Sequence, residues 1–456
     1  MLMGRGFAMG LAELTPVVQG RLQGEDVVAQ GVSTDTRSMT PGALFVALKG
    51  QNFDGHAFVA QAREKGASAA LLEQTIEDSL PQVEVADART ALGQLATYWR
   101  QRFEHPVVAV TGSNGKTTVK EMIASVLGGA GSVLATQGNL NNDIGVPLTL
   151  LGLDPSHRFA VIEMGANQPS EIGYLSCLVR PQVALITNAG PAHLDGFGDL
   201  KGVARAKGEI FQGVNPGGVA VLNADDPHFS YWRDLAGELP VIGFGLTQSA
   251  EVTAHHLAAH SEGSRFTLVT PVGKTPVQLS LPGRHNVLNA LAASAVAIAL
   301  GLDRDQISAA LAALPSIPGR LQIRRGAGGM RLLDDTYNAN PASLKAALEL
   351  LAEFPGERFL VLGDFAELGE EAAPLHRMMG KQARAAGVNR LYTLGHLSAL
   401  AAEAFGQEAL HFFEQQSLLA ALREEQRPNV TMLVKGSRCM RMEQIVAALG
   451  SDRDND

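Results

Sequence analysis

Short apolar runs recur along the chain, and a first series of them lies between residues 107 and 222. Its members are each bounded by Gly, Asn, Asp or Pro on at least one side: Val107–Val110, Phe159–Ile162, Val183–Thr187 and Val219–Leu222. Continuous rather than alternating apolar runs are typical of strands that are buried on both faces of a parallel sheet. Because helical patterns such as Val119–Leu127 and Leu200–Phe211 fall between the runs, this region predicts an α/β unit.

A second alternating series begins near Pro318. Its expected strands are Arg331–Leu333, Phe359–Leu362, Leu391–Leu394 and Met432–Val434. Its expected helices are Ser343–Glu353, Leu375–Ala386 and Leu418–Glu424. Strands that alternate with helices imply βαβ units with right-handed crossovers, so this part predicts a Rossmann-like C-terminal domain.

The first 85 residues mix short apolar runs, such as Ala43–Leu48, with turn clusters, and predict a small α/β domain. A helical pattern follows from Ala88 to Phe103, and we expect it to end before His105-Pro106, because proline disfavours a helical residue before it. A chain of 456 residues is too long for one hydrophobic core. We therefore predict three domains, at residues 1–85, 86–317 and 318–456.

Composition narrows the class of protein. Hydrophobic residues make up 46% of the chain and charged residues 18%, which indicates a folded globular protein. The net charge of -9 argues against a general nucleic-acid binder. The longest apolar stretch, Ala290–Leu302, is shorter than the ~20 residues of a membrane span and predicts a buried helix. With only Cys177 and Cys439 and no signal-peptide pattern, we expect a cytoplasmic protein.

The strand at Val107–Val110 runs directly into Thr111-Gly-Ser-Asn-Gly-Lys-Thr-Thr118 and then into a helical pattern. Strand, glycine-rich turn and helix form the context that a phosphate-binding loop requires. The glycines let successive N–H groups converge on phosphate oxygens, and the helix N-terminus adds partial positive charge. The strict motif has glycine where Val110 stands, so the loop is a variant, and a surface turn is the alternative interpretation.

Within that loop, Lys116 can reach the terminal phosphates of a nucleotide and the Thr117 hydroxyl can ligate Mg²⁺. Glu163 directly follows the expected strand Phe159–Ile162, where a carboxylate can hold Mg²⁺ beside the loop. Taken alone, His193 is a lone histidine of the kind that is usually structural, and Lys207 reads as a solvated helix lysine.

Five further runs accompany the variant loop: Gln137-Gly-Asn-Leu-Asn-Asn-Asp-Ile-Gly-Val-Pro147, Gly283-Arg-His-Asn-Val-Leu-Asn-Ala290, Asp334-Asp-Thr-Tyr-Asn-Ala-Asn-Pro341, Val361-Leu-Gly-Asp-Phe-Ala-Glu-Leu-Gly369 and Val434-Lys-Gly-Ser-Arg438. The loop, in its form Thr-Gly-x-Asn-Gly-Lys-Thr, and these runs together resemble the Mur ligase family, which adds amino acids to a UDP-muramoyl peptide. The resemblance covers essentially the whole chain, and this form of the loop is the family's own. The five runs look like the member that adds D-alanyl-D-alanine. The Asp-Asn-Pro-Arg signature expected of the diamino-acid-adding member is absent from the sequence.

The resemblance implies roles for individual residues. The expected catalytic residues are Lys116, Glu163, His193 and Lys207, of which Lys207 would be a carbamate. The expected metal ligands are Thr117, Glu163 and His193. The expected nucleotide-binding residues are Gly112, Ser113, Asn114, Gly115, Lys116, Thr117, Thr118, Asn289, Arg320 and Asp335. The expected substrate-binding residues are Ser33, Thr34, Arg37, Asn139, Asn142 and Asn338. An interdomain salt bridge is the alternative for Arg320, an exposed polar loop for Arg37, and an asparagine-rich turn for Asn139 and Asn142.

The resemblance therefore implies an ATP- and Mg²⁺-dependent ligase that adds D-alanyl-D-alanine to a UDP-N-acetylmuramoyl tripeptide through an acyl phosphate. We expect a monomer, and the third peptide residue, diaminopimelate or lysine, stays open. Another Mur-type ligase or folylpolyglutamate synthase is an alternative, although the latter gives no reason for a UDP-binding N-terminal domain. A regulatory GTPase of the same loop class should carry an Asn-Lys-x-Asp run, and the sequence has none.

Overall fold

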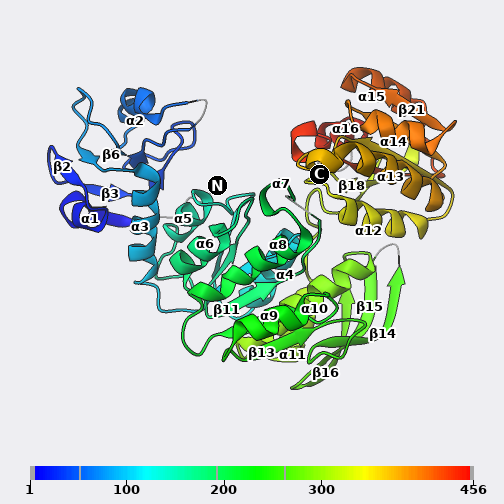
Figure 1. The fold of residues 1–456 in the computed structure, drawn as a ribbon, viewed down its shortest axis with the longest axis horizontal. Coiled ribbons are helices and arrows are strands. Elements are labelled where there is room, and N and C mark those ends of the chain that lie inside the picture. Colours follow the sequence, from blue (N-terminus) through cyan, green and yellow to red (C-terminus); the bar gives the residue numbers. More distant parts are fainter. Residues whose placement is uncertain (1–5, 51–52, 192–193, 261–262, 452–456) are drawn as a thin grey trace.

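The computed structural model describes residues 6–50, 53–191, 194–260 and 263–451. It has an α/β architecture of three parts, and Figure 1 shows the N-terminal and C-terminal parts on either side of the central one. No helix of the described residues is long and apolar enough to span a membrane.

The N-terminal part is built on a mixed sheet. Its strand order is β2 (Arg21–Gln23), β7 (Gln82–Glu84), β6 (Ala69–Leu72), β5 (Leu44–Val46) and β4 (Val32–Ser33), with only β2 antiparallel to its neighbour. A two-stranded ribbon and two helices complete this part: β1 (Ala8–Gly10), β3 (Val28–Gln30), α1 (Leu11–Val17) and α2 (Val59–Glu64).

Helix α3 (Ala88–Arg100) joins the N-terminal and central parts through one continuous apolar core. The helix ends at Arg100, earlier than the expected end at Phe103. The Arg100 side chain is buried and donates to the carbonyl oxygens of Phe103 at 2.6 Å and Val179 at 2.8 Å. A buried guanidinium needs such acceptors, and the Phe103 carbonyl oxygen, which lies beyond the end of the helix, supplies one of them.

The central part contains the parallel sheet that the first series of apolar runs predicts. Its order is β13 (Val241–Phe244), β12 (Val219–Asn223), β11 (Val183–Ile186), β8 (Val107–Thr111), β10 (Phe159–Glu163) and β9 (Val133–Ala135). One face packs against α3, α5 (Gly145–Leu150), α6 (Glu171–Val179), α8 (Leu200–Gly208) and α9 (Phe229–Ala236). The short helix α7 (Leu194–Phe197) precedes α8.

The other face packs against α4 (Lys116–Gly128), α10 (Arg284–Ala299), α11 (Arg304–Ala312) and an antiparallel sheet. Helix α10 is the buried helix expected from the alanine-rich stretch. The antiparallel sheet consists of β14 (Thr253–His260), β15 (Gly263–Thr270) and β16 (Gly273–Leu279), and the sequence analysis did not predict it.

The C-terminal part has the order β17 (Gln322–Arg325), β18 (Arg331–Asp335), β22 (Val430–Lys435), β19 (Glu357–Gly363), β20 (Arg390–Leu394) and β21 (Ala409–Phe412). Only β17 is antiparallel to its neighbour. Five helices cover the two faces: α12 (Pro341–Ala352), α13 (Ala372–Ala385), α14 (Ser398–Phe405), α15 (Gln415–Arg423) and α16 (Glu443–Leu449). This confirms the expected second α/β series.

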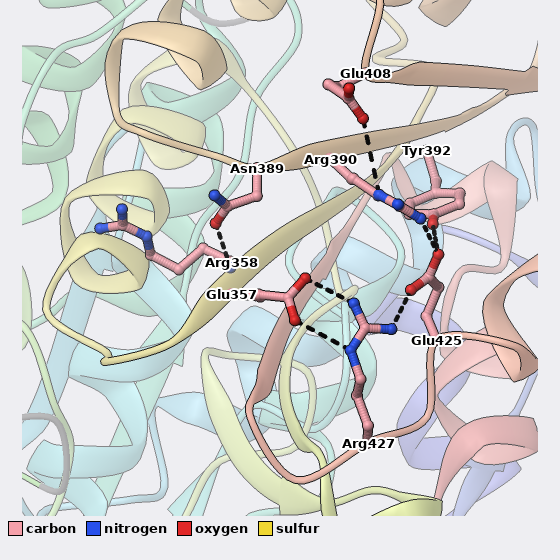
Figure 2. Close-up of polar contacts among 8 residues, drawn as sticks. All are labelled: Glu357, Arg358, Asn389, Arg390, Tyr392, Glu408, Glu425 and Arg427. Atoms are coloured by element: carbon pink, nitrogen blue, oxygen red, sulfur yellow. Dashed lines mark hydrogen bonds and ion pairs between the residues drawn. The ribbon is translucent and has the colours of Figure 1, made fainter.

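Figure 2 shows a polar network at the amino ends of β19 and β20. Arg427 binds the Glu357 carboxylate through two nitrogens, at 3.1 and 2.6 Å, and donates to Glu425 at 2.5 Å. Glu425 also accepts from the Tyr392 hydroxyl at 2.8 Å and from Arg390. The network ties together the amino ends of β19 and β20 and the segment before β22.

Candidate active site

The loop between β8 and α4 has a backbone that only glycine adopts without strain at two positions. Gly112 has φ 147° and Gly115 has φ 81°, and Gly115 immediately precedes α4. A Cβ atom at Gly115 would lie 2.7 Å from Asn289 Oδ1, and one at Gly112 would lie 1.9 Å from Thr187 Oγ1. The loop therefore needs both glycines for conformation and for space.

Polar side chains that follow β11 hold the loop in place. The Thr187 hydroxyl donates to the Asn114 carbonyl oxygen at 2.6 Å, and the Asn114 N–H donates to Asn188 Oδ1 at 2.9 Å. The Ser113 hydroxyl donates to the Gly190 carbonyl oxygen at 3.1 Å. These bonds fix the loop before a ligand arrives, which lowers the entropic cost of binding one.

Lys116 is the first residue of α4, and its Nζ donates to the carbonyl oxygen of Gly112 at 2.7 Å. Burial lowers the pKa of Lys116, whereas the nearby Glu163 carboxylate acts in the opposite direction. The ammonium thus lies against the loop with one acceptor among the described residues, and phosphate oxygens would supply others.

Glu163 ends β10 beside the loop, and 2% of its surface is exposed. Its Oε1 accepts from Asn141 Nδ2 at 2.8 Å, but its Oε2 is buried without a hydrogen-bond partner among the described residues. A buried carboxylate oxygen without a partner is costly, and a hard cation would satisfy it.

The described residues contain no group of three or more His, Cys, Asp or Glu that could hold a metal. Mg²⁺ usually binds one or two carboxylates together with substrate phosphates and water, so a single carboxylate such as Glu163 is compatible with it. The Thr117 hydroxyl is a second oxygen donor in the same cavity as Glu163. His193, the other expected ligand, lies outside the described residues.

Lys207 lies on α8 and is 2% exposed. Burial, and secondly the charge of Lys116, lower the pKa of Lys207 to about 7. The Nζ atom lies 5.6 Å from the centre of the Phe197 ring. The structure therefore contradicts the view of Lys207 as a solvated helix lysine and leaves it a substantial neutral fraction near neutral pH.

Two contacts join the C-terminal part to the loop. Arg320 Nη2 donates to Thr117 Oγ1 at 3.2 Å, and the Arg320 guanidinium carbon lies 4.2 Å from the centre of the Tyr337 ring. Asn340 Nδ2 donates to Asn114 Oδ1 at 2.6 Å, while Asn340 Oδ1 accepts from Ser343 N at 2.9 Å and so caps α12. Residues distant in sequence thus meet at the phosphate loop.

The phosphate loop, Glu163, Lys207, Arg320 and Asn340 line a cavity of about 960 Å³ between the central and C-terminal parts. Of the residues predicted from sequence, it brings together Ser113, Asn114, Gly115, Lys116, Thr117, Asn139, Asn142, Glu163, Lys207, Arg320 and Asn338. Asn142 Oδ1 also accepts from Gly145 N at 2.9 Å, at the start of α5. The remaining lining residues were not singled out by sequence, and among them are Arg89, Asn141, Tyr174, Tyr337, Asn340 and Arg438.

Other predicted residues lie beside the cavity rather than on its wall. Asn289 lies against Gly115, and Thr118 is buried in the first turn of α4. Asp335 Oδ2 accepts from the buried Lys435 Nζ at 2.5 Å. Gly112 belongs to the loop itself and is not among the residues that line the cavity. The roles predicted for these residues stay predictions.

The expected UDP-binding residues lie in the N-terminal part, away from this cavity. The Ser33 hydroxyl donates to the Asp35 carbonyl oxygen at 3.1 Å, and Ser33 lines a small hollow against the helix α5 segment. Arg37 pairs with Asp35 at 2.7 Å, and its side chain is 86% exposed. Thr34 lies between them in sequence. Any ligand that touches both this loop and Lys116 must span two parts of the fold.

Three family models match consecutive parts of the chain. Their descriptions are Mur ligase family, catalytic domain, for residues 28–100; Mur ligase middle domain for residues 110–297; and Mur ligase, glutamate ligase domain, for residues 319–438. The chain belongs to the Mur ligase family. The phosphate loop, Glu163 and Lys207 all fall within the match to the Mur ligase middle domain.

Individual Mur ligases are similar to the chain over nearly its whole length. UDP-N-acetylmuramoyl-tripeptide–D-alanyl-D-alanine ligase of Escherichia coli (strain K12) is 47% identical, with 96% of this chain and 98% of the relative covered. The ligase of the same name from Bacillus subtilis (strain 168) is 36% identical, with 96% and 97% covered.

Solved structures of Mur ligases are also similar to this chain. A crystal structure of MurF from Acinetobacter baumannii matches with a TM-score of 0.92 at 37% identity, covering 98% of this chain and 99% of that chain. MurF ligase from Thermotoga maritima in complex with ADP matches with a TM-score of 0.82 at 29% identity, covering 92% and 96%. A Mycobacterium tuberculosis folylpolyglutamate synthase shares the fold, at 18% identity, with a TM-score of 0.65 and 79% of this chain and 94% of that chain covered.

Proposed function

We propose that the chain is an ATP-dependent, ADP-forming ligase that joins D-alanyl-D-alanine to UDP-N-acetylmuramoyl tripeptide during peptidoglycan precursor synthesis. The observation that carries the proposal is the cavity in which the phosphate loop, Glu163 and Lys207 meet Arg320. Similarity to ligases of this name at 47% and 36% identity supports the choice of substrates. We place the reaction in the cytoplasm, where nucleotide-linked precursors and ATP occur together, and we expect a monomer.

The nucleotide would bind with its phosphates at the loop. Backbone N–H groups of the loop and the N-terminus of α4 would hold the phosphate oxygens, and Lys116 would turn from the Gly112 carbonyl to the terminal phosphates. Arg320, 3.2 Å from the Thr117 hydroxyl, is placed to neutralise charge on the group being transferred. Asn289 and Asp335 would complete the nucleotide site from α10 and β18.

Mg²⁺ fits the oxygen donors beside the loop. Glu163 and Thr117, with His193, would hold it, and the buried Glu163 Oε2 would gain the partner it lacks among the described residues. When bound, Mg²⁺ would neutralise negative charge on the phosphates. Asn141, which donates to Glu163 Oε1 at 2.8 Å, keeps the carboxylate oriented with Oε2 free.

The reaction would proceed through two covalent steps. A terminal carboxylate oxygen of the tripeptide attacks the γ-phosphorus of ATP, so that an acyl phosphate forms and ADP leaves. The amine of D-alanyl-D-alanine then attacks the acyl carbon, loses a proton and expels inorganic phosphate. Lys116, Arg320 and the loop amides stabilise charge on the phosphoryl group.

We assign Lys207 the role of a carbamate. A pKa of about 7 leaves an unprotonated amine that can add CO₂ and release a proton, which converts a buried cation into an anion. An anion there would complement the cations Lys116 and Arg320, and Mg²⁺ when bound. The charge reversal also relieves the repulsion between Lys207 and Lys116.

The three predicted domains divide the recognition. Residues 1–85 would bind the UDP group through Ser33, Thr34 and Arg37, and residues 86–317 would bind ATP. Asn139 and Asn142 would hold the muramoyl peptide, and Asn338 would contact substrate from residues 318–456. Closure of the cavity would exclude water, which would otherwise hydrolyse the acyl phosphate.

Phosphate release by the purified chain tests the proposal. We expect release only when ATP, a UDP-muramoyl tripeptide and D-alanyl-D-alanine are all present, and running the assay with the diaminopimelate and lysine tripeptides identifies the third residue. Turnover with a folate and glutamate would instead support the folylpolyglutamate synthase alternative. Nucleotide hydrolysis that ignores both peptide substrates would refute the ligase.

A further inference from the structure

Two cations on the described cavity wall, Arg89 and Arg438, have no role in the mechanism above. The cationic side chains among the described residues that line the cavity are Arg89, Lys116, Lys207, Arg320 and Arg438. Lys116 and Arg320 are at the phosphate loop, and Lys207 is buried behind it. Arg89 lies on α3 and donates to Asp143 Oδ2 at 2.9 Å, so its guanidinium already has a close carboxylate partner. Arg438 is the unused cation whose carboxylate partner is more distant.

Arg438 is available to an anion. Its ion pair with Glu443 measures 3.6 Å, and the Arg438 side chain is 63% exposed. A pair of that length at an exposed position contributes little, so an incoming carboxylate can displace it at low cost. A guanidinium can bind both oxygens of a carboxylate at once, which gives orientation as well as affinity.

The backbone that carries Arg438 is firmly held. Lys435 Nζ, 1% exposed as a residue, donates to Asp335 Oδ2 at 2.5 Å and to the Asn338 carbonyl oxygen at 3.1 Å. The Ser437 hydroxyl accepts from Ala366 N at 2.8 Å. These bonds tie the segment around the end of β22 to its neighbours, so the backbone from which Arg438 extends is held before a ligand binds.

Tyr337 lies beside both Arg320 and Arg438, which limits the distance between the two guanidinium groups. The guanidinium carbon of Arg320 lies 4.2 Å from the centre of the Tyr337 ring, and that of Arg438 lies 5.7 Å from the same point. The two carbons are therefore no more than about 10 Å apart, and an extended dipeptide, at ~3.3–3.6 Å per residue, spans ~7 Å. A dipeptide with its amine near Arg320 can reach Arg438 with its carboxylate.

We propose that Arg438 binds the terminal carboxylate of the acceptor dipeptide. The inference rests on the proposed function, which brings into the cavity a molecule with an amine at one end and a carboxylate at the other. The amine must reach the acyl carbon beside Arg320, and a carboxylate that enters the cavity without a cation would be costly. The N-terminus of α12 is a weaker candidate, because Asn340 Oδ1 already accepts from Ser343 N at 2.9 Å.

The test compares D-alanyl-D-alanine with D-alanyl-D-alanine amide, which lacks the carboxylate. Steady-state phosphate release is measured for wild type, Arg438→Ala and Arg438→Lys. Arg423→Ala is the matched control, because Arg423 is exposed on the same part of the fold and does not line the cavity. Thermal unfolding of each variant shows that the fold is intact.

For wild type we expect the KM for the amide to exceed the KM for the acid by about 10- to 100-fold. Arg438→Ala should raise the KM for the acid by a similar factor and abolish the difference between acid and amide. Arg438→Lys should recover part of the difference, and Arg423→Ala should retain all of it. The KM values for ATP and the UDP-tripeptide should stay within about 2-fold of wild type in every variant.

Two results would overturn the inference while leaving the ligase intact: equal KM values for acid and amide in wild type, or full acid–amide discrimination in Arg438→Ala. A rise in the KM for ATP in Arg438→Ala would also overturn it, because it would show that Arg438 supports Tyr337 and Arg320 rather than the dipeptide. Absence of any dipeptide-dependent phosphate release from wild type would refute the proposed function itself, and the inference with it.

Discussion

Substituting Gly115 by alanine should weaken both the fold and the nucleotide site. Gly115 has φ 81°, and placing an L-residue in the left-handed region costs about 1–2 kcal/mol. The new Cβ would also lie 2.7 Å from Asn289 Oδ1, so Asn289 or the loop must move. We expect Gly115→Ala to lower the free energy of unfolding by at least the backbone cost, about 1–2 kcal/mol.

A matched control lies at the other end of the same helix. A Cβ atom at Gly128 would meet nothing within 4 Å, and its backbone is helical, so Gly128→Ala should raise the stability by up to about 1 kcal/mol. Denaturant unfolding of the two variants and wild type measures both changes. The clash with Asn289 is only part of the cost of Gly115→Ala. The double variant Gly115→Ala/Asn289→Ala should therefore be less destabilised relative to Asn289→Ala than Gly115→Ala is relative to wild type, but it should still be less stable than Asn289→Ala alone.

The same Gly115→Ala variant should bind ATP more weakly than wild type, because the displaced loop amides no longer converge on the phosphates. Isothermal titration with ATP and Mg²⁺ measures the loss. The reasoning would be refuted if Gly115→Ala unfolded at the same denaturant concentration as wild type and bound ATP with the same affinity. Neither the left-handed conformation of Gly115 nor the contact with Asn289 would then matter.

Three further predictions follow from individual side chains. Glu163→Gln should raise the Mg²⁺ concentration needed for half-maximal activity by about 10-fold or more, as magnesium titrations would show, because the free Oε2 loses its charge. Activation by bicarbonate should grow as pH rises through about 7, where Lys207 loses its proton, and Lys207→Ala should not respond; an equal response at acidic and alkaline pH would contradict the carbamate. Glu425→Gln should lower the stability by about 1–3 kcal/mol in denaturant unfolding, because Arg427 and Tyr392 lose a buried carboxylate, whereas its exposed neighbour Glu424→Gln should change little.

Lys207 also predicts how stability depends on pH. Its pKa of about 7 in the folded chain is below the ordinary value of 10.5, so the unfolded chain binds more protons between these values. The contribution of Lys207 to the free energy of unfolding should therefore rise with pH across that window. Comparing the pH dependence of unfolding in wild type and Lys207→Met isolates the contribution, and identical slopes would contradict it.

The parallel strands could be predicted because burial on both faces leaves a continuous apolar run, as in Val107–Val110 and Phe359–Leu362. The antiparallel sheet β14–β16 leaves a weaker signal. In β15, Phe266 and Leu268 are buried with Thr267 between them, and a period of two over a few residues is easily overlooked.

The phosphate loop could be predicted from sequence because strand, glycines and helix are adjacent in the chain. Asn141, Asn340 and Arg438 could not, because their importance depends on partners brought near by folding: Glu163, Asn114 and Tyr337. All three nevertheless lie inside the runs that carry the family resemblance. Those runs held more information than the individual residues chosen from them.

The central claim, an acyl phosphate formed on the tripeptide, is tested most directly by isotope transfer. A UDP-muramoyl tripeptide labelled with oxygen-18 in its terminal carboxylate is turned over with ATP and D-alanyl-D-alanine, and the inorganic phosphate is analysed by mass spectrometry. Activation of that carboxylate by the γ-phosphate predicts one labelled oxygen in each phosphate released. Phosphate that carries no label, released in step with amide formation, would contradict the account.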